Sequence, residues 1–176
     1  DISIPMIILK KQSMRFIMRD LNFNREPTFS FGKAGNDSGF IWSSGRGHRT
    51  DFSNDESFGH DTNHSRKIIL FSHGNRSQLG TKINYLKYLR DNLEIDVCCY
   101  EYPGYGLARY DNNGSQITPS EENCLKSIHQ VYHELINLGY LPSNIYVVGH
   151  SLGTGPSLWL STQVKLGGVF LYAPYT

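Results

Sequence analysis

Between Lys67 and Thr176, short apolar runs alternate regularly with segments of helical periodicity. The apolar runs have the length and composition of buried strands. They are expected at Ile68–Phe71, Val97–Tyr102, Ile145–Val148 and Val169–Ala173. Strands that alternate with helices in this way form a mostly parallel sheet, because each right-handed crossover lays a helix on a face of the sheet. The sequence therefore predicts an α/β fold with helices on both faces.

Two of the connecting helices can be given boundaries from the sequence. One is expected over residues 79–93, where leucine and isoleucine recur at three- and four-residue spacings. The next is expected to begin with Thr118 as its N-cap, with Pro119 in the first turn and Glu121 completing a capping box. Gly139 is expected to end it.

The N-terminal segment, residues 1–66, lacks this regular alternation. An alternation of apolar and polar residues indicates one strand near residues 14–18. Residues 33–66 are rich in Gly, Ser, Asn, Asp and His, and bury too little apolar surface to offset their ordering entropy. A mobile polar loop is expected there, and the folded core is expected over residues 67–176.

Charge and cysteine content exclude several classes of function. The formal net charge of +1 argues against a nucleic-acid partner. No apolar run approaches the ~20 residues that span a bilayer. The three cysteines, Cys98, Cys99 and Cys124, show no metal-type spacing. They are expected to be reduced, buried thiols of a cytoplasmic protein.

Gly149, Ser151 and Gly153 form a Gly-x-Ser-x-Gly motif directly after the strand Ile145–Val148 and before an apolar helix that extends to about Gln163. This strand–turn–helix setting is typical of a nucleophile elbow. The turn is so tight that side chains two residues either side of the serine would clash. It holds the serine hydroxyl at a helix N-terminus, where backbone N–H groups favour negative charge. Ser151 is therefore the predicted nucleophile.

A second turn supplies the other half of the predicted site. His73, Gly74 and Asn75 follow the strand Ile68–Phe71. A serine hydrolase needs two backbone donors for the tetrahedral oxyanion. The N–H groups of Asn75 and Leu152 are expected to be these donors. His73 and Gly74 are expected to support the oxyanion loop, and Gly149, His150 and Gly153 the elbow.

Four strings occur in this chain in a characteristic order: Leu70–Asn75, Tyr102–Gly106, Pro119–Glu121 and Gly149–Gly155. Together they resemble α/β-hydrolase-domain serine hydrolases, the branch that includes protein depalmitoylases and lysophospholipid lipases. The resemblance covers residues 67–176. It implies an α/β-hydrolase fold that is C-terminally incomplete in this chain, no cofactor, and an acylated protein or lipid as substrate. It also implies peripheral association with membranes.

This chain departs from the family pattern in two places. The depalmitoylase group carries a cysteine-rich, lipid-modified N-terminus, whereas this chain has no cysteine before Cys98. The link Leu107–Ile117 is also longer and more polar than the family's usual one.

The rest of a catalytic triad is not found after Ser151. In this fold the acid and then the histidine follow the serine, but residues 152–176 contain no Asp, Glu or His. Both partners are expected beyond Thr176. A triad that lacks a member retains only ~10³–10⁴-fold catalysis over water, so residues 1–176 alone are expected to be nearly inactive.

The other histidines are assigned no catalytic or metal role. His73 and His150 are expected to be structural, with the His150 ring directed away from the serine. His129 and His133 lie four residues apart on a helix, a spacing that suits a metal pair. They lack a third ligand nearby and are expected to face solvent. The histidines within residues 60–64 are expected to be solvated.

The sequence leaves two classes of function open. In the first, the protein is an enzyme that cleaves acyl esters or thioesters through an acyl–Ser151 intermediate. Protein depalmitoylation ranks narrowly ahead of lysophospholipid or monoacylglycerol hydrolysis, and peptide hydrolysis ranks third. In the second, the protein is a catalytically inactive hydrolase fold that serves as a binding module.

Overall fold

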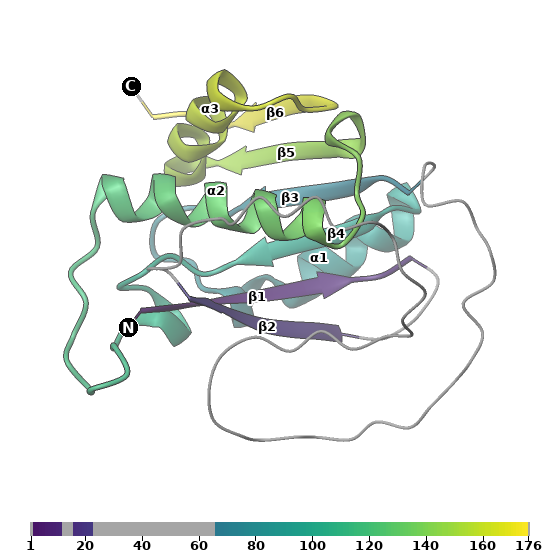
Figure 1. Ribbon diagram of the computed structural model, residues 1–176. Helices are drawn as coiled ribbons and strands as arrows, with labels where there is room; N and C mark the ends of the chain where they lie inside the picture. The colour runs from purple at the N-terminus through teal and green to yellow at the C-terminus, as the bar shows by residue number, and fades with distance from the viewer. Residues whose placement is uncertain (1, 12–15, 23–65, 176) are drawn as a thin grey trace.

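A computed structural model describes residues 2–11, 16–22 and 66–175, and its strands form one six-stranded sheet (Figure 1). The strand order is β2-β1-β4-β3-β5-β6. Strands β3, β4, β5 and β6 are parallel to one another, and β1 is antiparallel to both of its neighbours. The strands are β1 (Ser3–Leu9), β2 (Phe16–Asn22), β3 (Ile68–Ser72), β4 (Asp96–Tyr100), β5 (Ile145–His150) and β6 (Gly168–Tyr172). The last four lie within two residues of their predicted bounds.

Three α-helices cover the two faces of the sheet: α1 (Leu79–Leu93), α2 (Glu121–Asn137) and α3 (Thr154–Gln163). Helix α1 packs on one face, and α2 and α3 pack on the other (Figure 1). Three short 3₁₀ turns, η1 (Gly106–Ala108), η2 (Pro142–Asn144) and η3 (Ser151–Gly153), complete the connections. This mostly parallel sheet with helices on both faces confirms the predicted fold class. None of the described helices is long and apolar enough to cross a membrane.

The two faces of the sheet have separate cores, and adjacent cysteines divide between them. Cys98 packs under α2 and α3, whereas Cys99 packs under α1. Both thiols and that of Cys124 are free and buried, as predicted. Burial raises the pKa of all three thiols, which keeps them protonated.

Strand β1 was not expected from the sequence, yet it lies inside the sheet between β2 and β4. Its residues alternate between the two cores: Ile4, Met6 and Ile8 face α2, and Ile7 and Leu9 face α1. A strand buried on both faces shows no polar alternation, so its sequence lacks the pattern of a half-exposed strand. The strand near residues 14–18 corresponds to β2, and the predicted loop lies, apart from Arg66, outside the described residues.

A polar cluster fixes the end of β1 to the rest of the molecule. The buried Tyr140 hydroxyl donates to the Asp96 carboxylate, which also accepts the N–H of Lys11. Lys10 and Arg66 both pair with Asp96 and lie 4.7 Å from the Tyr140 ring centroid. Burial lowers the pKa of Lys10.

The start of α2 differs from the prediction. Its N-cap is Ser120, whose side chain accepts the N–H of Asn123, and the helix begins at Glu121. Thr118 and Pro119 lie before the helix. A Cβ on Gly104 would lie 2.6 Å from Pro119 Cγ, so the proline ring packs against the Gly104 backbone and stays in the loop.

Replacing Ile8 by alanine tests the burial of β1. Ile8 is fully buried, so Ile8→Ala is expected to lower the free energy of unfolding by ~2–5 kcal/mol. Leu93→Ala, at a position that is 52% exposed, is expected to cost less than ~1 kcal/mol. Urea unfolding monitored by circular dichroism measures both. Equal losses would contradict the placement of β1.

Candidate active site

Ser151 lies at the turn that joins β5 to α3, in a backbone conformation that non-glycine residues rarely adopt. Its φ is +48°, in the left-handed region. Such strain costs ~1–3 kcal/mol and persists only where the surrounding structure enforces it. The Thr154 hydroxyl donates to the Ser151 carbonyl oxygen at 2.6 Å and helps to hold this turn.

The two glycines of the motif stand where no side chain fits. A Cβ on Gly149 would lie 2.7 Å from the carbonyl oxygen of Gly153 and 2.8 Å from Ser157 Oγ. A Cβ on Gly153 would lie 2.1 Å from the carbonyl oxygen of Ser72, at the end of β3. The elbow therefore packs directly on the backbone of the neighbouring strand.

The loop after β3 contacts the elbow at Gly74. A Cβ there would lie 2.9 Å from His150 Nδ1 and 3.2 Å from Ser151 Cβ. The structure thus brings Gly74, His150 and Ser151 together. The next residue, Asn75, is exposed, and its Oδ1 accepts the Tyr105 hydroxyl at 3.1 Å.

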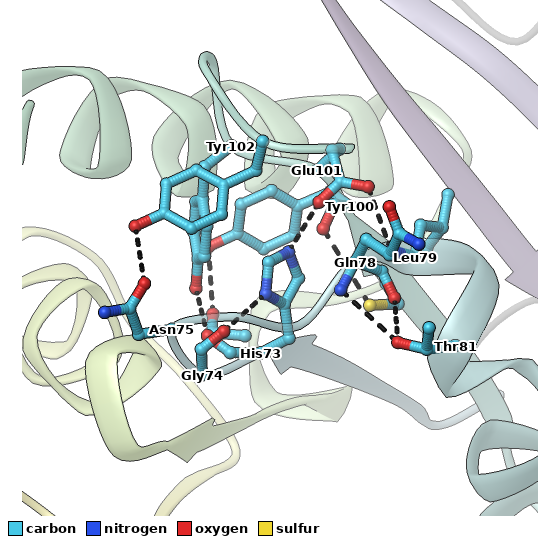
Figure 2. A network of polar contacts seen from close by, with 12 residues as sticks. His73, Gly74, Asn75, Gln78, Leu79, Thr81, Tyr100, Glu101 and Tyr102 are labelled. Carbon is cyan, nitrogen blue, oxygen red and sulfur yellow. Dashed lines mark hydrogen bonds and ion pairs between the residues drawn. The ribbon is translucent and has the colours of Figure 1, made fainter. Parts of the chain in front are cut away.

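A buried polar network holds this loop, as Figure 2 shows. His73 Nδ1 lies 3.0 Å from the Gly74 carbonyl oxygen, and Nε2 lies 2.9 Å from Glu101 Oε1, both side chains being fully buried. The Tyr102 hydroxyl donates to the His73 carbonyl oxygen at 2.9 Å. Glu101 Oε2 accepts the Leu79 N–H at 2.9 Å, so the same carboxylate caps the N-terminus of α1.

The His150 ring stacks on Tyr172, with centroids 4.5 Å apart and planes 17° from parallel. Its Nδ1 is buried and makes no hydrogen bond within the described residues. Burial lowers the pKa of His150, and the positive charge of Lys82 lowers it further. The ring therefore packs as a neutral imidazole.

Two cavities flank the elbow. The apolar cavity has a volume of about 450 Å³ and is lined by Tyr105, Pro119, Ser120, Glu121, Cys124, Leu125, Leu152, Gly155, Pro156, Trp159 and Tyr175. The polar cavity has a volume of about 360 Å³ and is lined by Asn75, Arg76, Ser77, Gln78, Thr81, Gly104, Tyr105, Gly106, Arg109 and Pro119. Ser151 lines neither cavity, but Leu152 lines the first and Asn75 the second. The two predicted oxyanion donors therefore line different cavities.

The expectation that His129 and His133 face solvent is wrong. Both rings are half-buried, their Nε2 atoms lie 3.1 Å apart, and His129 packs edge-on against Trp159 of α3. In this contact one of the two nitrogens donates a hydrogen bond to the other. Among the described residues, no group of three or more His, Cys, Asp or Glu side chains could hold a metal ion.

Sequence reasoning missed Glu101 and Tyr105 as parts of the site. Glu101 lies directly after β4, and its carboxylate is fully buried beside apolar neighbours. A charged residue at the end of a strongly apolar strand is the signal that could have indicated it, because buried charges need partners. Tyr105 lies within a string noted only for its family resemblance.

Comparison with known proteins identifies similar sequences. The chain is 43% identical over 112 residues to a protein of Acanthamoeba polyphaga mimivirus that is named as an alpha/beta hydrolase. It is 33% identical over 111 residues to alpha/beta hydrolase domain-containing protein 17C of Xenopus tropicalis. Each match covers 62% of this chain, but only 40% and 34% of the respective relatives, so the chain spans less than half of their length. These matches confirm the resemblance to α/β-hydrolase-domain proteins.

No protein-family model matches the chain. Among solved structures, the Francisella virulence factor BioJ aligns with 62% of this chain and 36% of its own, at 22% identity and a TM-score of 0.47.

Replacing Gly153 by alanine tests the close packing of the elbow on the Ser72 backbone. Gly153→Ala is expected to lower the free energy of unfolding by ~3 kcal/mol, since its Cβ would overlap the Ser72 backbone. Gly80→Ala is the matched control. It lies within α1 with no atom near its Cβ, and it is expected to stabilise by ~0.5–1 kcal/mol. Urea unfolding measures both. A harmless Gly153→Ala would contradict the close packing of the elbow.

The His129–His133 pair predicts how stability changes with pH. Burial lowers the pKa of both rings from the ordinary value of 6.5, so protons bind the unfolded chain more readily. The stability present above pH 6.5 is therefore expected to be lost as the pH falls through the lowered folded-state pKa values. Melting temperatures between about pH 8 and about pH 5 measure this loss.

The double variant His129→Gln, His133→Gln is expected to flatten this dependence in part. It leaves the contribution of His150, whose pKa is also lowered. An unchanged pH slope in the double variant would show that the pair is not responsible.

Proposed function

We propose that the protein is a serine hydrolase that cleaves acyl esters or thioesters through a covalent acyl–Ser151 intermediate. The observation that carries this proposal is the left-handed backbone of Ser151, with φ of +48°. The residue sits between glycines that admit no Cβ and in contact with the loop after β3. A strained serine held at a strand–helix turn is the geometry of an exposed nucleophile.

The turns after β3 and β5 can provide the oxyanion hole. The N–H of Leu152 lies in the first turn after Ser151, and the N–H of Asn75 follows the Gly74 contact. Ser151 Oγ would attack the acyl carbonyl carbon, and the carbonyl oxygen would take the negative charge between these donors. Collapse of the tetrahedral intermediate would break the bond to the alkoxide or thiolate leaving group. Water would then release the acid.

Proton removal from Ser151 requires a base, and His73 is unsuited to that role. One of its ring nitrogens contacts the Gly74 carbonyl oxygen and the other contacts Glu101. We propose that the acid and histidine of the triad lie downstream of Thr176, in the part of the protein that corresponds to the unmatched length of its relatives.

The apolar cavity beside Leu152 suits the acyl chain. Leucine, proline and tryptophan side chains line it, and its volume of about 450 Å³ accommodates an aliphatic chain of moderate length. The proposed substrate is therefore an acylated protein or lipid. We propose that this hydrolase meets its substrate at the membrane surface. Protein depalmitoylation is the first candidate activity, and hydrolysis of lysophospholipids or monoacylglycerols is the second.

Labelling with a fluorophosphonate probe tests the nucleophile in the longest native form of the protein. The native protein is expected to be labelled covalently, because an activated serine attacks phosphorus as it attacks a carbonyl. Ser151→Ala is expected to abolish labelling completely. Ser161→Ala, which alters a half-buried serine on α3 that donates to the Leu158 carbonyl oxygen, is expected to leave labelling unchanged. A folded native protein that resists labelling would favour the inactive binding module instead.

A further inference from the structure

The polar cavity and the apolar cavity meet at a common wall formed by Tyr105 and Pro119. Asn75 lines the polar cavity, and Leu152 lines the apolar one. A carbonyl oxygen held between the N–H groups of these two residues would have one cavity beside each donor. The acyl chain would extend into the apolar cavity and the leaving group into the polar cavity.

Charge is distributed unequally between the two cavities. Arg76 and Arg109 are the only charged residues that line the polar cavity, and both are exposed. Neither forms an ion pair within the described part of the chain. In the apolar cavity, the only charged lining residue is Glu121, in the first turn of α2. The leaving-group side therefore carries two positive charges without a lining carboxylate.

A buried carboxylate, that of Glu101, lies behind the wall of the polar cavity and does not line it. Glu101 Oε2 lies directly behind Gly106, where an added Cβ would be 2.2 Å away. Both oxygens of that carboxylate are already engaged, one by His73 and the other by the Leu79 N–H. Gly106, with φ of +40°, thus separates the buried Glu101 carboxylate from the open polar cavity.

We propose that the polar cavity binds a phosphate monoester on the leaving group of a monoacylated substrate. This preference would favour the second candidate class, the lysophospholipids, over acylated proteins. A phosphate monoester carries a charge of about −1.5 to −2 at neutral pH, which matches two arginines. Guanidinium groups bind phosphate oxygens through paired N–H donors. The assignment of the leaving group to this cavity rests on the proposed function. Binding of the phosphate by the two arginines does not depend on hydrolysis.

Binding of two ligands that differ only in the phosphate tests this proposal. The ligands are 1-octanoylglycerol and 1-octanoylglycerol 3-phosphate. The protein carries Ser151→Ala, which prevents turnover, and Trp42→Phe, which leaves Trp159 as the one tryptophan within residues 1–176. Trp159 lines the apolar cavity, so its emission reports entry of the acyl chain. Fluorescence titration gives the Kd of each ligand.

The phosphate-bearing ligand is expected to bind at least about tenfold more tightly than the neutral one. Arg76→Ala and Arg109→Ala are each expected to reduce this preference by about tenfold, while binding of octanoylglycerol stays unchanged. Lys67→Ala is the charge-matched control. This exposed lysine precedes β3, at the opposite end of the strand from the site, and its removal is expected to have no effect.

Equal binding of both ligands or no binding of either would overturn the proposal. So would a phosphate preference that survives in the variant carrying both Arg76→Ala and Arg109→Ala. A preference reduced equally by Lys67→Ala would reveal attraction to overall charge and would also overturn it. Failure of the proposed function is distinguished by the fluorophosphonate test. If the native protein is not labelled by the fluorophosphonate probe but still prefers the phosphate-bearing ligand, the protein binds phosphate without being a hydrolase.

Discussion

The close packing of Gly153 on the carbonyl oxygen of Ser72 is the contact on which the arrangement of the site depends. The register of β3 and β5 places Ser72 opposite Gly149, so the two turns that follow these strands emerge side by side. The turns meet through backbone atoms, so Gly74 lies against Ser151 with no room for a side chain between them. A side chain at Gly153 or Gly74 would force the turns apart. The glycines therefore set the distance between the proposed nucleophile and its oxyanion donors.

Side chains hold the loop after β3, because irregular backbone there has no sheet partner. The Gly74 carbonyl oxygen can only accept, so His73 Nδ1 carries a proton. His73 Nε2 lies 2.9 Å from the Glu101 carboxylate, so the two side chains form a fully buried polar pair. Removing either partner would leave an uncompensated buried group, a loss of ~3–5 kcal/mol for a buried ion pair. The loop is thus fixed before any substrate binds, which is the condition for electrostatic stabilisation of a transition state.

Local patterns were sufficient to predict much of this structure, and contacts between distant segments account for what was missed. The parallel strands and their helices follow from periodicity and turn residues. Strand β1 escaped prediction because both of its faces are buried. The N-cap of α2 was misassigned because the packing of Pro119 against Gly104 involves residues fifteen positions apart. The His129–His133 contact depends partly on Trp159 of the next helix, and Glu101 acts on a loop that precedes it by nearly thirty residues. A single sequence carries no record of such pairings.

The described residues separate two tasks that a serine hydrolase must combine. In the proposed mechanism, the backbone at Ser151 and Gly74 and the N–H groups that follow prepare the site for negative charge. Proton removal requires a histidine other than His73. Electrostatic preparation and substrate binding retain ~10³–10⁴-fold catalysis when a triad is broken, so they are independent of the base. Substrate selection can therefore be encoded within this chain, by the cavities on either side of the elbow, even where the base lies elsewhere. The arginines of the polar cavity act on the leaving group through charge, and that interaction is present whether or not the serine is activated.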